Sequence, residues 1–546
     1  MTVTSTQARS AETATTVLDA VIIGAGISGM YMLHRLRALG LKARVYEAGT
    51  DVGGTWYWNR YPGARVDIES QEYSYSFSEE LEREWKWSER YAAQPEILRY
   101  LNHVAERFDL RRDMVFNTRI ASAHFDEASN TWQVATDTGE QITARFCIAA
   151  TGCLSVPNEP RFEGQDRFTG PTYHTGRWPH EGVDFTGKRV AVIGTGSSAI
   201  QSIPQIAQQA SEVYVFQRTP NYSVPAHNGP INPAVTEGWL ASREENRQLQ
   251  KVSRAGFIFS NPGGLLATQT GDNERREVFE SRWAQGGFSV QSAFADIGVD
   301  PVANAMAAEF AADKIREIVK DPETAEKLVP KGYPFGAKRL CVDTGYYEVF
   351  NQDHVHLIDL RETPLTTITE TGVETTEAGF EVDAIVFAIG FDAMTGALSK
   401  IDITGREGLS LTQAWAEGPK TYLGLMITGF PNFFTITGPG SPSVLSNMIV
   451  SIEQHVDWLT DLIGYMTGVG IALIEPTLES QNAWVDHVNE IAGHTLYTQA
   501  NSWYLGANIP GKPRVFMPYI GGVGAYRELC TAVAANGYMG FKLRRA

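Results

Sequence analysis

The sequence predicts an α/β fold with two Rossmann-like dinucleotide-binding domains and a helical insertion. Two glycine-rich turns, at Gly24 and Gly194, each lie between a β-branched strand and a helix. Segments with polar helical patterns, such as AMAAEFAADKIREIVKDPETAEKL, fill much of 223–334. A chain of 546 residues is too long for one hydrophobic core, and its hydrophobic content of 43% is enough to fill several.

The domains are expected to be discontinuous, because the last third of the chain rejoins the first domain. Residues 1–18 are rich in Thr, Ala and Ser and lack the apolar segment of a secretory signal, so we expect a disordered tail. The predicted bounds are 19–155 and 385–546 for the first (FAD-binding) domain, 156–222 and 335–384 for the second (NADP-binding) domain, and 223–334 for the helical insertion.

The first glycine turn lies in LDAVIIGAGISGMYMLHRLRALG. Gly24 permits the tight turn, Gly26 lets the backbone approach a pyrophosphate, and Gly29 lets helix and strand pack closely. The next strand, KARVYEA, ends in Glu47, where such folds place an acid against a ribose hydroxyl. This turn therefore predicts a dinucleotide with free ribose hydroxyls.

The second turn lies in KRVAVIGTGSSAIQSIPQIA, with Gly194 and Gly196 in register and Ser197 opening the helix. The following strand ends without an acid, in Arg218 and Thr219. A guanidinium and a hydroxyl suit a 2′-phosphate, which predicts NADPH. The alternative is that Arg218 is a solvated surface arginine.

One acid-type and one phosphate-type site together predict a flavoprotein in which NADPH reduces FAD. A flavin-dependent disulfide reductase would carry a cysteine pair soon after the first turn, yet residues 30–146 contain no cysteine. The four cysteines have no metal-ligand spacing, which indicates free thiols, a reducing compartment and no bound metal; they are Cys147, Cys153, Cys341 and Cys530.

Charge and hydropathy narrow the expected partners. The net charge of −17 opposes nucleic acid or an anionic membrane as a main partner. The apolar span 462–474 is shorter than the roughly 20 residues that a bilayer requires. We therefore expect a cytoplasmic monomer or weak oligomer that acts on small molecules.

The stretch FTGPTYHTGRWPH (168–180) resembles the FxGxxxHTxxWP fingerprint of type I Baeyer–Villiger monooxygenases. GGTWYWNRYPGARVD (53–67) resembles a second motif of that family, and SWYLGANIPGKPRVF (502–516) is similar to its phenylacetone and steroid monooxygenase subgroup. Two positions depart from the family pattern: His180 replaces a frequent Asp, and Ile389 replaces a Thr.

The resemblance implies insertion of one oxygen atom from O2 next to a ketone carbonyl, through a C4a-peroxyflavin, to give an ester or lactone. The alternatives are an N- or S-oxygenating flavin monooxygenase and an NADPH-dependent flavoprotein reductase. It also implies that the fingerprint is a linker, in which Trp178 restricts bending and His174 forms a hydrogen bond across the joint between the domains.

By the same resemblance, Arg339 is the active-site cation and Asp67 positions it, while Lys338 helps to hold the NADP phosphate. Lys338 and Arg339 can alternatively be a basic surface pair, and Asp67 a helix cap or solvated acid. The remaining positions implied are Gly54, Trp56 and Trp503 for the cofactors, and Leu445 and Met448 for the substrate pocket. Leu445 and Met448 are equally consistent with ordinary core residues.

Overall fold

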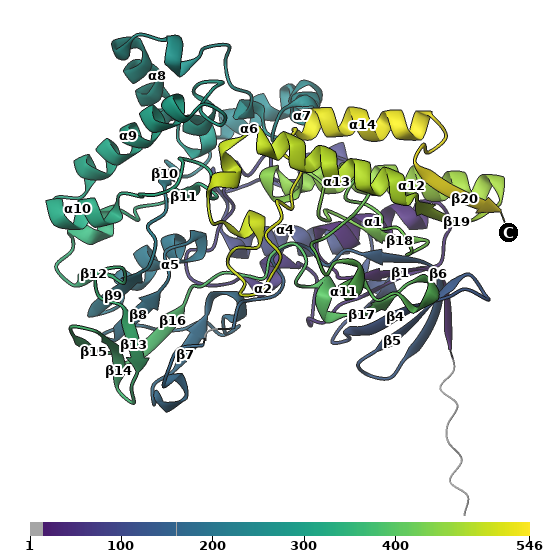
Figure 1. The fold of residues 1–546 in the computed structure, drawn as a ribbon, viewed down its shortest axis with the longest axis horizontal. Coiled ribbons are helices and arrows are strands. Elements are labelled where there is room, and N and C mark those ends of the chain that lie inside the picture. The colour runs from purple at the N-terminus through teal and green to yellow at the C-terminus, as the bar shows by residue number, and fades with distance from the viewer. Residues whose placement is uncertain (1–14, 160, 546) are drawn as a thin grey trace, which may run out of the picture.

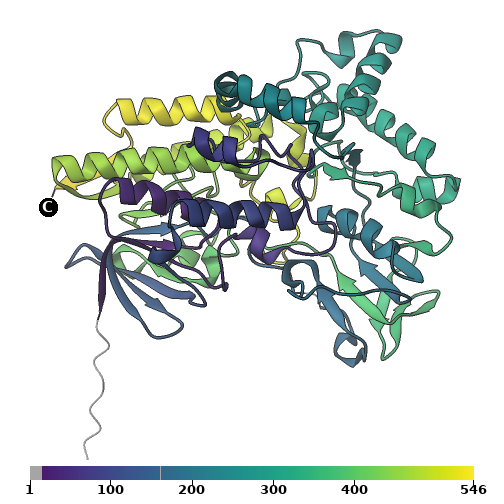
Figure 2. The ribbon, with the colours of Figure 1, turned by 180° about the vertical axis from the view of Figure 1, so that it is seen from behind.

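The computed structural model describes residues 15–159 and 161–545. Two sheet-containing domains lie side by side, and a helical segment extends over the smaller sheet and toward the larger domain (Figure 1). The view from behind shows the same separation of the two sheets (Figure 2). The chain therefore has the two-domain α/β architecture that its glycine turns predict.

The larger sheet has eight strands. Its parallel part has the order β3-β2-β1-β6-β18, and β6 continues through antiparallel β5 and β4 to β17. Near-continuous apolar runs such as AVII in β1 suit strands that are covered on both faces. The bounds are β1 (Thr16–Ile23), β2 (Ala43–Tyr46), β3 (Met114–Val115), β4 (Ile120–Asp126), β5 (Thr131–Thr136), β6 (Gln141–Ala149), β17 (Asp402–Thr404) and β18 (Phe433–Thr435).

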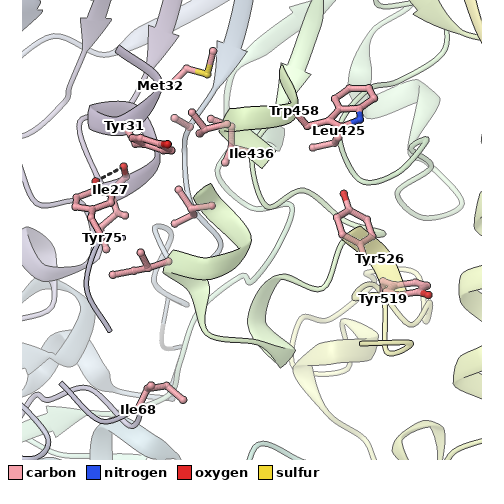
Figure 3. Packing of buried hydrophobic residues seen from close by; sticks show 14 of the residues in the cluster. Ile27, Tyr31, Met32, Ile68, Tyr75, Leu425, Ile436, Trp458, Tyr519 and Tyr526 are labelled. Carbon is pink, nitrogen blue, oxygen red and sulfur yellow. Dashed lines mark hydrogen bonds between the residues drawn. The ribbon is translucent and has the colours of Figure 1, made fainter. Parts of the chain in front are cut away.

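Helices from both ends of the chain pack on this sheet in one hydrophobic cluster. Figure 3 shows Tyr31 and Tyr75 from the N-terminal part facing the side that holds Trp458 and Tyr526, and the Tyr75 hydroxyl donates to the Ile27 carbonyl oxygen at 2.6 Å. The elements of this region are α1 (Ile27–Ala38), α2 (Thr55–Trp58), α3 (Glu79–Glu84), α4 (Gln94–Arg107), α11 (Leu411–Ala414), α12 (Met448–Val469), α13 (Leu478–Gly493), α14 (Val523–Ala535), β19 (Ile471–Pro476) and β20 (Phe541–Arg545).

The smaller sheet is fully parallel, with the order β12-β9-β8-β16-β7. Helix α5 (Ser197–Ala207) follows its glycine turn and tolerates Pro204 within the helix. A three-stranded antiparallel sheet is inserted before β16. The bounds are β7 (Thr172–His174), β8 (Arg189–Ile193), β9 (Glu212–Gln217), β12 (Val355–Asp359), β13 (Leu365–Ile368), β14 (Gly372–Thr375), β15 (Gly379–Glu381) and β16 (Ala384–Phe387).

The predicted helical insertion between the two parts of the second domain is present. Its aromatic residues Phe279, Phe294 and Phe310 are buried in the same cluster as the core of the larger domain. A short parallel pair, β10 (Ser223–Pro225) with β11 (Cys341–Asp343), closes its ends. The helices are α6 (Pro233–Ala241), α7 (Arg243–Val252), α8 (Asp272–Gln285), α9 (Pro301–Ile318) and α10 (Pro322–Leu328).

Two predicted boundaries are wrong. Strand β1 begins at Thr16 and pairs with β6 from that residue, so the tail does not extend to residue 18; residues 1–14 lie outside the described residues. The first domain does not resume at residue 385, because β16 pairs in parallel with both β8 and β7 of the smaller sheet. The chain rejoins the larger sheet only at β17.

Candidate active site

The first glycine turn is packed too tightly for side chains. Gly24 has a φ of +105°, and a Cβ on Gly29 would lie 1.9 Å from the Gly24 carbonyl oxygen. Gly26 and Gly54 approach each other so closely that a Cβ on Gly54 would lie 2.8 Å from the Gly26 Cα. Gly54 therefore supports the turn itself, in addition to any contact that it makes with a cofactor.

The helices that follow the two glycine turns have open N-termini, as do α2 and α14. Neither α1 nor α5 has a side-chain cap or an acidic residue in its first turn. Their first backbone N–H groups are therefore available to an anion, which fits the pyrophosphate of a dinucleotide. By contrast, several helices have side-chain caps, namely Asp300 for α9, Asp321 for α10, Asn447 for α12 and Thr477 for α13.

Glu47 lies at the end of β2, as predicted, and is buried. Its Oε2 accepts a hydrogen bond from the Ala25 N–H at 2.8 Å, and its Oε1 accepts one from the Gly49 N–H at 2.7 Å. The acid thus holds the glycine turn in place, a role that the sequence did not indicate. Each carboxylate oxygen has a second acceptor site, so a contact with a ribose hydroxyl stays a prediction. Nearby, Trp56 is buried and donates to the Tyr73 hydroxyl at 3.2 Å.

The second turn is tight at its first glycine and open at its second. A Cβ on Gly194 would lie 2.4 Å from the Ala388 carbonyl oxygen, whereas a Cβ on Gly196 would meet no described atom within 4 Å. Ser197 lies beside Cys341, with Oγ and Sγ 3.2 Å apart. The space next to Gly196 is where the backbone can admit a phosphate group.

Two cations lie near this turn without a carboxylate partner among the described residues. Arg218 follows β9 and is exposed, and no Asp or Glu oxygen in the described chain lies within 4.0 Å of Arg218 or Lys338. Burial, together with the nearby Arg218 charge, lowers the pKa of Lys338. Two like charges that approach each other in this way are stabilised by an anion, which fits the 2′-phosphate of NADPH. Thr219 accepts from Thr195 through its carbonyl oxygen at 2.8 Å, which fixes the strand end.

Arg339 and Asp67 form an ion pair, although they are distant in the sequence. The Arg339 Nη2 and Nε lie 2.6 and 3.1 Å from Asp67 Oδ2, and Nη1 donates to the Val444 carbonyl oxygen at 2.7 Å. Burial lowers the pKa of Arg339, but the charge and hydrogen bond of Asp67, together with Tyr504 and Cys341, outweigh burial and the net pKa is raised. Arg339 is therefore a charged cation with a fixed orientation. The alternative, in which Lys338 and Arg339 form a basic surface pair, does not fit the structure.

This guanidinium lies on the wall of a cavity of about 110 Å³. The cavity wall combines aromatic, aliphatic and polar residues, and the Arg339 guanidinium lies 5.6 Å from the centre of the Phe288 ring. Leu445 lines the cavity as predicted, together with Ile68, Phe257, Phe294, Val444, Tyr497 and Tyr504. No sequence motif predicts which residues of the helical insertion line the cavity, because these aromatic residues occur in segments of average composition.

Met448 and Trp503 lie behind this cavity and do not line it. Met448 is the first residue of α12 and packs against two hydrophobic clusters. The Trp503 ring packs 4.4 Å from the Tyr504 ring, between centroids. Met448 thus has a packing role in this structure, and the predicted substrate contact of Met448 and nicotinamide contact of Trp503 both stay predictions.

The fingerprint linker is anchored in the second domain. Trp178 is buried and packs 5.4 Å from the Tyr173 ring. The hydrogen bond of His174 across the joint stays a prediction: its Nδ1 accepts from the Gly176 N–H, 3.0 Å away, within the linker, while its buried Nε2 has no partner among the described residues. Across the joint, the His180 ring instead contacts the Tyr57 ring edge-on at 5.1 Å.

Two uncapped glycine turns, an unpaired cation pair at one of them and a charged cavity between the larger domain and the helical insertion define a flavoprotein oxidoreductase that binds two dinucleotides. A family model described as pyridine nucleotide-disulphide oxidoreductase matches residues 21–257. Among the described residues, no group of three His, Cys, Asp or Glu side chains is placed to hold a metal ion, and no helix has the length and apolarity needed to cross a membrane.

Known proteins narrow this class. The chain is 45% identical to a Baeyer–Villiger monooxygenase of Pseudooceanicola batsensis over 95% of each chain. Its structure matches steroid monooxygenase bound to NADP with a TM-score of 0.94, at 54% identity over 97% of this chain and 100% of the other. It matches OTEMO in complex with FAD and NADP with a TM-score of 0.93, at 42% identity over 97% and 100%. The chain belongs to the Baeyer–Villiger monooxygenases, which use FAD, NADPH and O2 to convert ketones into esters or lactones.

The two turns predict opposite outcomes for the same substitution. Gly29→Ala forces a Cβ into the Gly24 carbonyl and should cost about 1–3 kcal/mol, with loss of FAD during purification. Gly196→Ala meets no protein atom, so the fold and FAD content should be retained while NADPH binding weakens. Flavin absorbance and NADPH titration measure both effects. Unchanged NADPH affinity in Gly196→Ala would show that no phosphate lies against this turn.

Arg218→Ala should lower the preference for NADPH over NADH about tenfold or more, because a charge-assisted contact with phosphate is lost. The measurement is kcat/KM for flavin reduction with each nucleotide. Arg361→Ala is the matched control, since Arg361 lies at the end of the neighbouring strand but is paired with Asp359. An equal preference in Arg218→Ala and the unmutated protein contradicts the phosphate assignment.

Proposed function

We propose that Arg339 is the catalytic cation of ketone oxygenation and that Asp67 positions it. One observation carries this proposal: an arginine held by a carboxylate lies on the wall of a cavity between the larger domain and the helical insertion. Side chains of this pair are 26% and 24% exposed, so the charge is accessible from the cavity and poorly screened by water. Arg254 also lines the cavity, but no carboxylate of the described residues lies within 4.0 Å of it.

FAD and NADPH, when bound, supply hydride transfer and the activation of O2. Arg339 provides a fixed positive charge where negative charge develops on oxygen during attack on the ketone carbonyl. An arginine has five N–H donors, of which Asp67 and Val444 take three, leaving two for oxygen atoms in the cavity. Aromatic residues in the wall limit water, which keeps this electrostatic interaction strong.

The substrate class that fits the cavity is a compact ketone with one aryl or alicyclic ring. A cavity of about 150 Å³ holds one benzene ring, so a volume of about 110 Å³ lies at the lower limit for a single ring and is too small for a fused ring system without movement of a wall. The neighbouring structure named for steroids does not decide this point, because substrate size depends on this chain's own walls. Phe257 is one of the residues that limit the cavity.

We propose a cytoplasmic monomer or weak oligomer as the working form. All four cysteines are free and buried, which suits a reducing compartment. The net charge of −17 favours mutual repulsion between copies.

Arg339→Ala should leave NADPH reduction of the flavin measurable while ester formation falls by about 10² to 10³, as for loss of an oxyanion donor. Electrons should then escape as hydrogen peroxide. Arg339→Lys should rescue poorly, because an ammonium lacks the planar fork that Asp67 binds. Rapid mixing of the reduced, NADP⁺-bound variant with O2, followed by ester quantification, tests this. Ester formation near the unmutated rate would remove Arg339 from the mechanism, and reduction without any ester in the unmutated protein would favour a reductase.

Cavity size should appear in a ketone series. A single-ring ketone should have a kcat/KM at least about tenfold above that of a fused four-ring ketone, given the 10- to 200-fold effects of small steric differences in pockets. Phe257→Ala should reduce this ratio, whereas Phe279→Ala, which alters the core of the insertion outside the cavity wall, should not. Equal kcat/KM across the series in the unmutated protein contradicts the size limit.

A further inference from the structure

Glu72 is a buried carboxyl group that the proposed mechanism does not use. It is 4% exposed and lies five residues after Asp67, in the segment that leads away from the ion pair. No Lys, Arg or His nitrogen of the described chain lies within 4.0 Å of its carboxylate. A carboxyl group in such a place is costly to bury, so the contacts that it makes need an explanation.

The carboxylate holds one wall of the cavity. Its Oε2 accepts from the Ile258 N–H at 2.9 Å and from the Gln250 amide at 3.3 Å. Ile258 begins a short 3₁₀ helix (Ile258–Ser260), and Phe257 directly before it lines the cavity. The loop 255–260 is thus attached through Glu72 to the segment that contains Asp67.

The backbone of Glu72 holds a second wall. Its carbonyl oxygen accepts from the Asn447 amide at 2.8 Å, and the Asn447 side chain also caps α12 through the Ile449 N–H at 3.1 Å. The Asn447 backbone N–H donates to the Ala255 carbonyl oxygen at 2.7 Å, which closes the connection between the two walls. Leu445, two residues earlier, lines the cavity. Residues in both segments, 255–260 and 445–447, therefore donate hydrogen bonds to Glu72.

The surroundings of Glu72 are themselves fixed. Gln250 is 1% exposed and accepts from the Arg247 Nη1 at 2.9 Å, while Arg247 pairs with the buried Glu82 at 2.9 Å. These contacts tie α7 to the first domain independently of Glu72. Gln250 also donates to the Gly256 carbonyl oxygen at 3.3 Å, and the Gly256 N–H donates to Ser253 Oγ at 3.0 Å. The Glu72 carboxylate adds the contact with the Ile258 N–H, directly after Phe257.

We infer that Glu72 is a positioning residue for substrate size: its carboxylate holds the Phe257 wall against the Leu445 wall and keeps the cavity compact. This inference rests on the proposed function, since it concerns the cavity that contains Arg339. Loss of the carboxylate weakens a charge-assisted hydrogen bond to a backbone N–H. The wall then opens toward larger ketones and holds compact ketones less well.

Ionisation of Glu72 makes this contact sensitive to pH. Its pKa is raised to about 7, mainly by burial; the Glu69 charge contributes to the rise, whereas the Ile258 N–H, the Arg247 charge and the Gln250 amide oppose it. The neighbouring Asn447 is neutral. Because the folded pKa lies above the ordinary value, the protonated form favours the folded state, and this stability is lost as pH rises through about 7. The hydrogen bond to the wall has the opposite dependence, since it is strongest when the group is ionised.

The test replaces Glu72 with Gln, which keeps the shape and removes the charge. For the FAD- and NADP-loaded enzyme, the KM of a single-ring ketone should rise about three- to tenfold at a pH of about 8, with kcat retained because Asp67 and Arg339 are unchanged. In the unmutated enzyme this KM should rise as pH falls from about 8 to about 6 around the Glu72 pKa of about 7, and in Glu72→Gln this dependence should be lost.

Glu453→Gln is the matched control. Glu453 is also a buried glutamate with a pKa raised by burial, but it accepts from the Ser76 N–H at 2.7 Å and does not line or hold the cavity. The control should keep the KM and pH dependence of the unmutated enzyme. A similar KM change in both variants, or none in Glu72→Gln, overturns the inference.

Hydrogen exchange of residues 255–260 gives a readout that does not need ketone turnover. At a pH of about 8, Glu72→Gln should exchange these amides faster than the unmutated holoenzyme, and Glu453→Gln should not. Faster exchange without any ketone oxygenation in the unmutated enzyme would contradict the proposed function and keep the positioning role. Unchanged exchange together with normal oxygenation would contradict the positioning role alone.

Discussion

The ion pair between Arg339 and Asp67 is the constraint on which the arrangement of the active site depends. Asp67 belongs to the first domain, Arg339 immediately precedes β11 at the end of the helical insertion, and the Val444 carbonyl oxygen comes from the segment before α12. Removing either charge would leave the other partly buried and unpaired, which is unfavourable. The ion pair that docks the insertion on the first domain therefore also places the charge that we propose to be catalytic.

The features that could be predicted from the sequence are those that depend on residues close together in the chain. Gly24, Gly29 and Gly194 are required by backbone contacts a few residues away or by one neighbouring strand, so their spacing carries the information. The roles of Arg339 and Asp67 came from resemblance to a family, because no local pattern links residues 272 positions apart. The cavity walls could not be predicted, since their position depends on how the insertion packs against the C-terminal part.

Where the sequence predictions differ from the structure or are incomplete, the cause is a short strand or a side chain with more than one hydrogen-bonding atom. Strand β16 is a buried run, AIVF, in which all four residues are covered, so its sequence lacks the alternation that would assign it to a sheet edge or face. Glu47 was correctly placed at a strand end, but a carboxylate has several acceptor sites and two of them are used by backbone N–H groups. A histidine that accepts from an N–H two residues later, as His174 does, leaves no signature in the sequence.

The fingerprint linker belongs to the second domain and contacts the first domain. His174 ends β7, which pairs with β16, and Trp178 is buried in the core of the smaller sheet's domain. The linker therefore moves as part of that domain and does not bend independently. Its contact with the first domain is at His180, whose ring meets Tyr57, and the Tyr57 hydroxyl accepts from the Thr50 N–H at 3.0 Å. Because Thr50 follows the Gly49 that binds Glu47, packing at His180 connects the second domain to the loop that supports the first glycine turn.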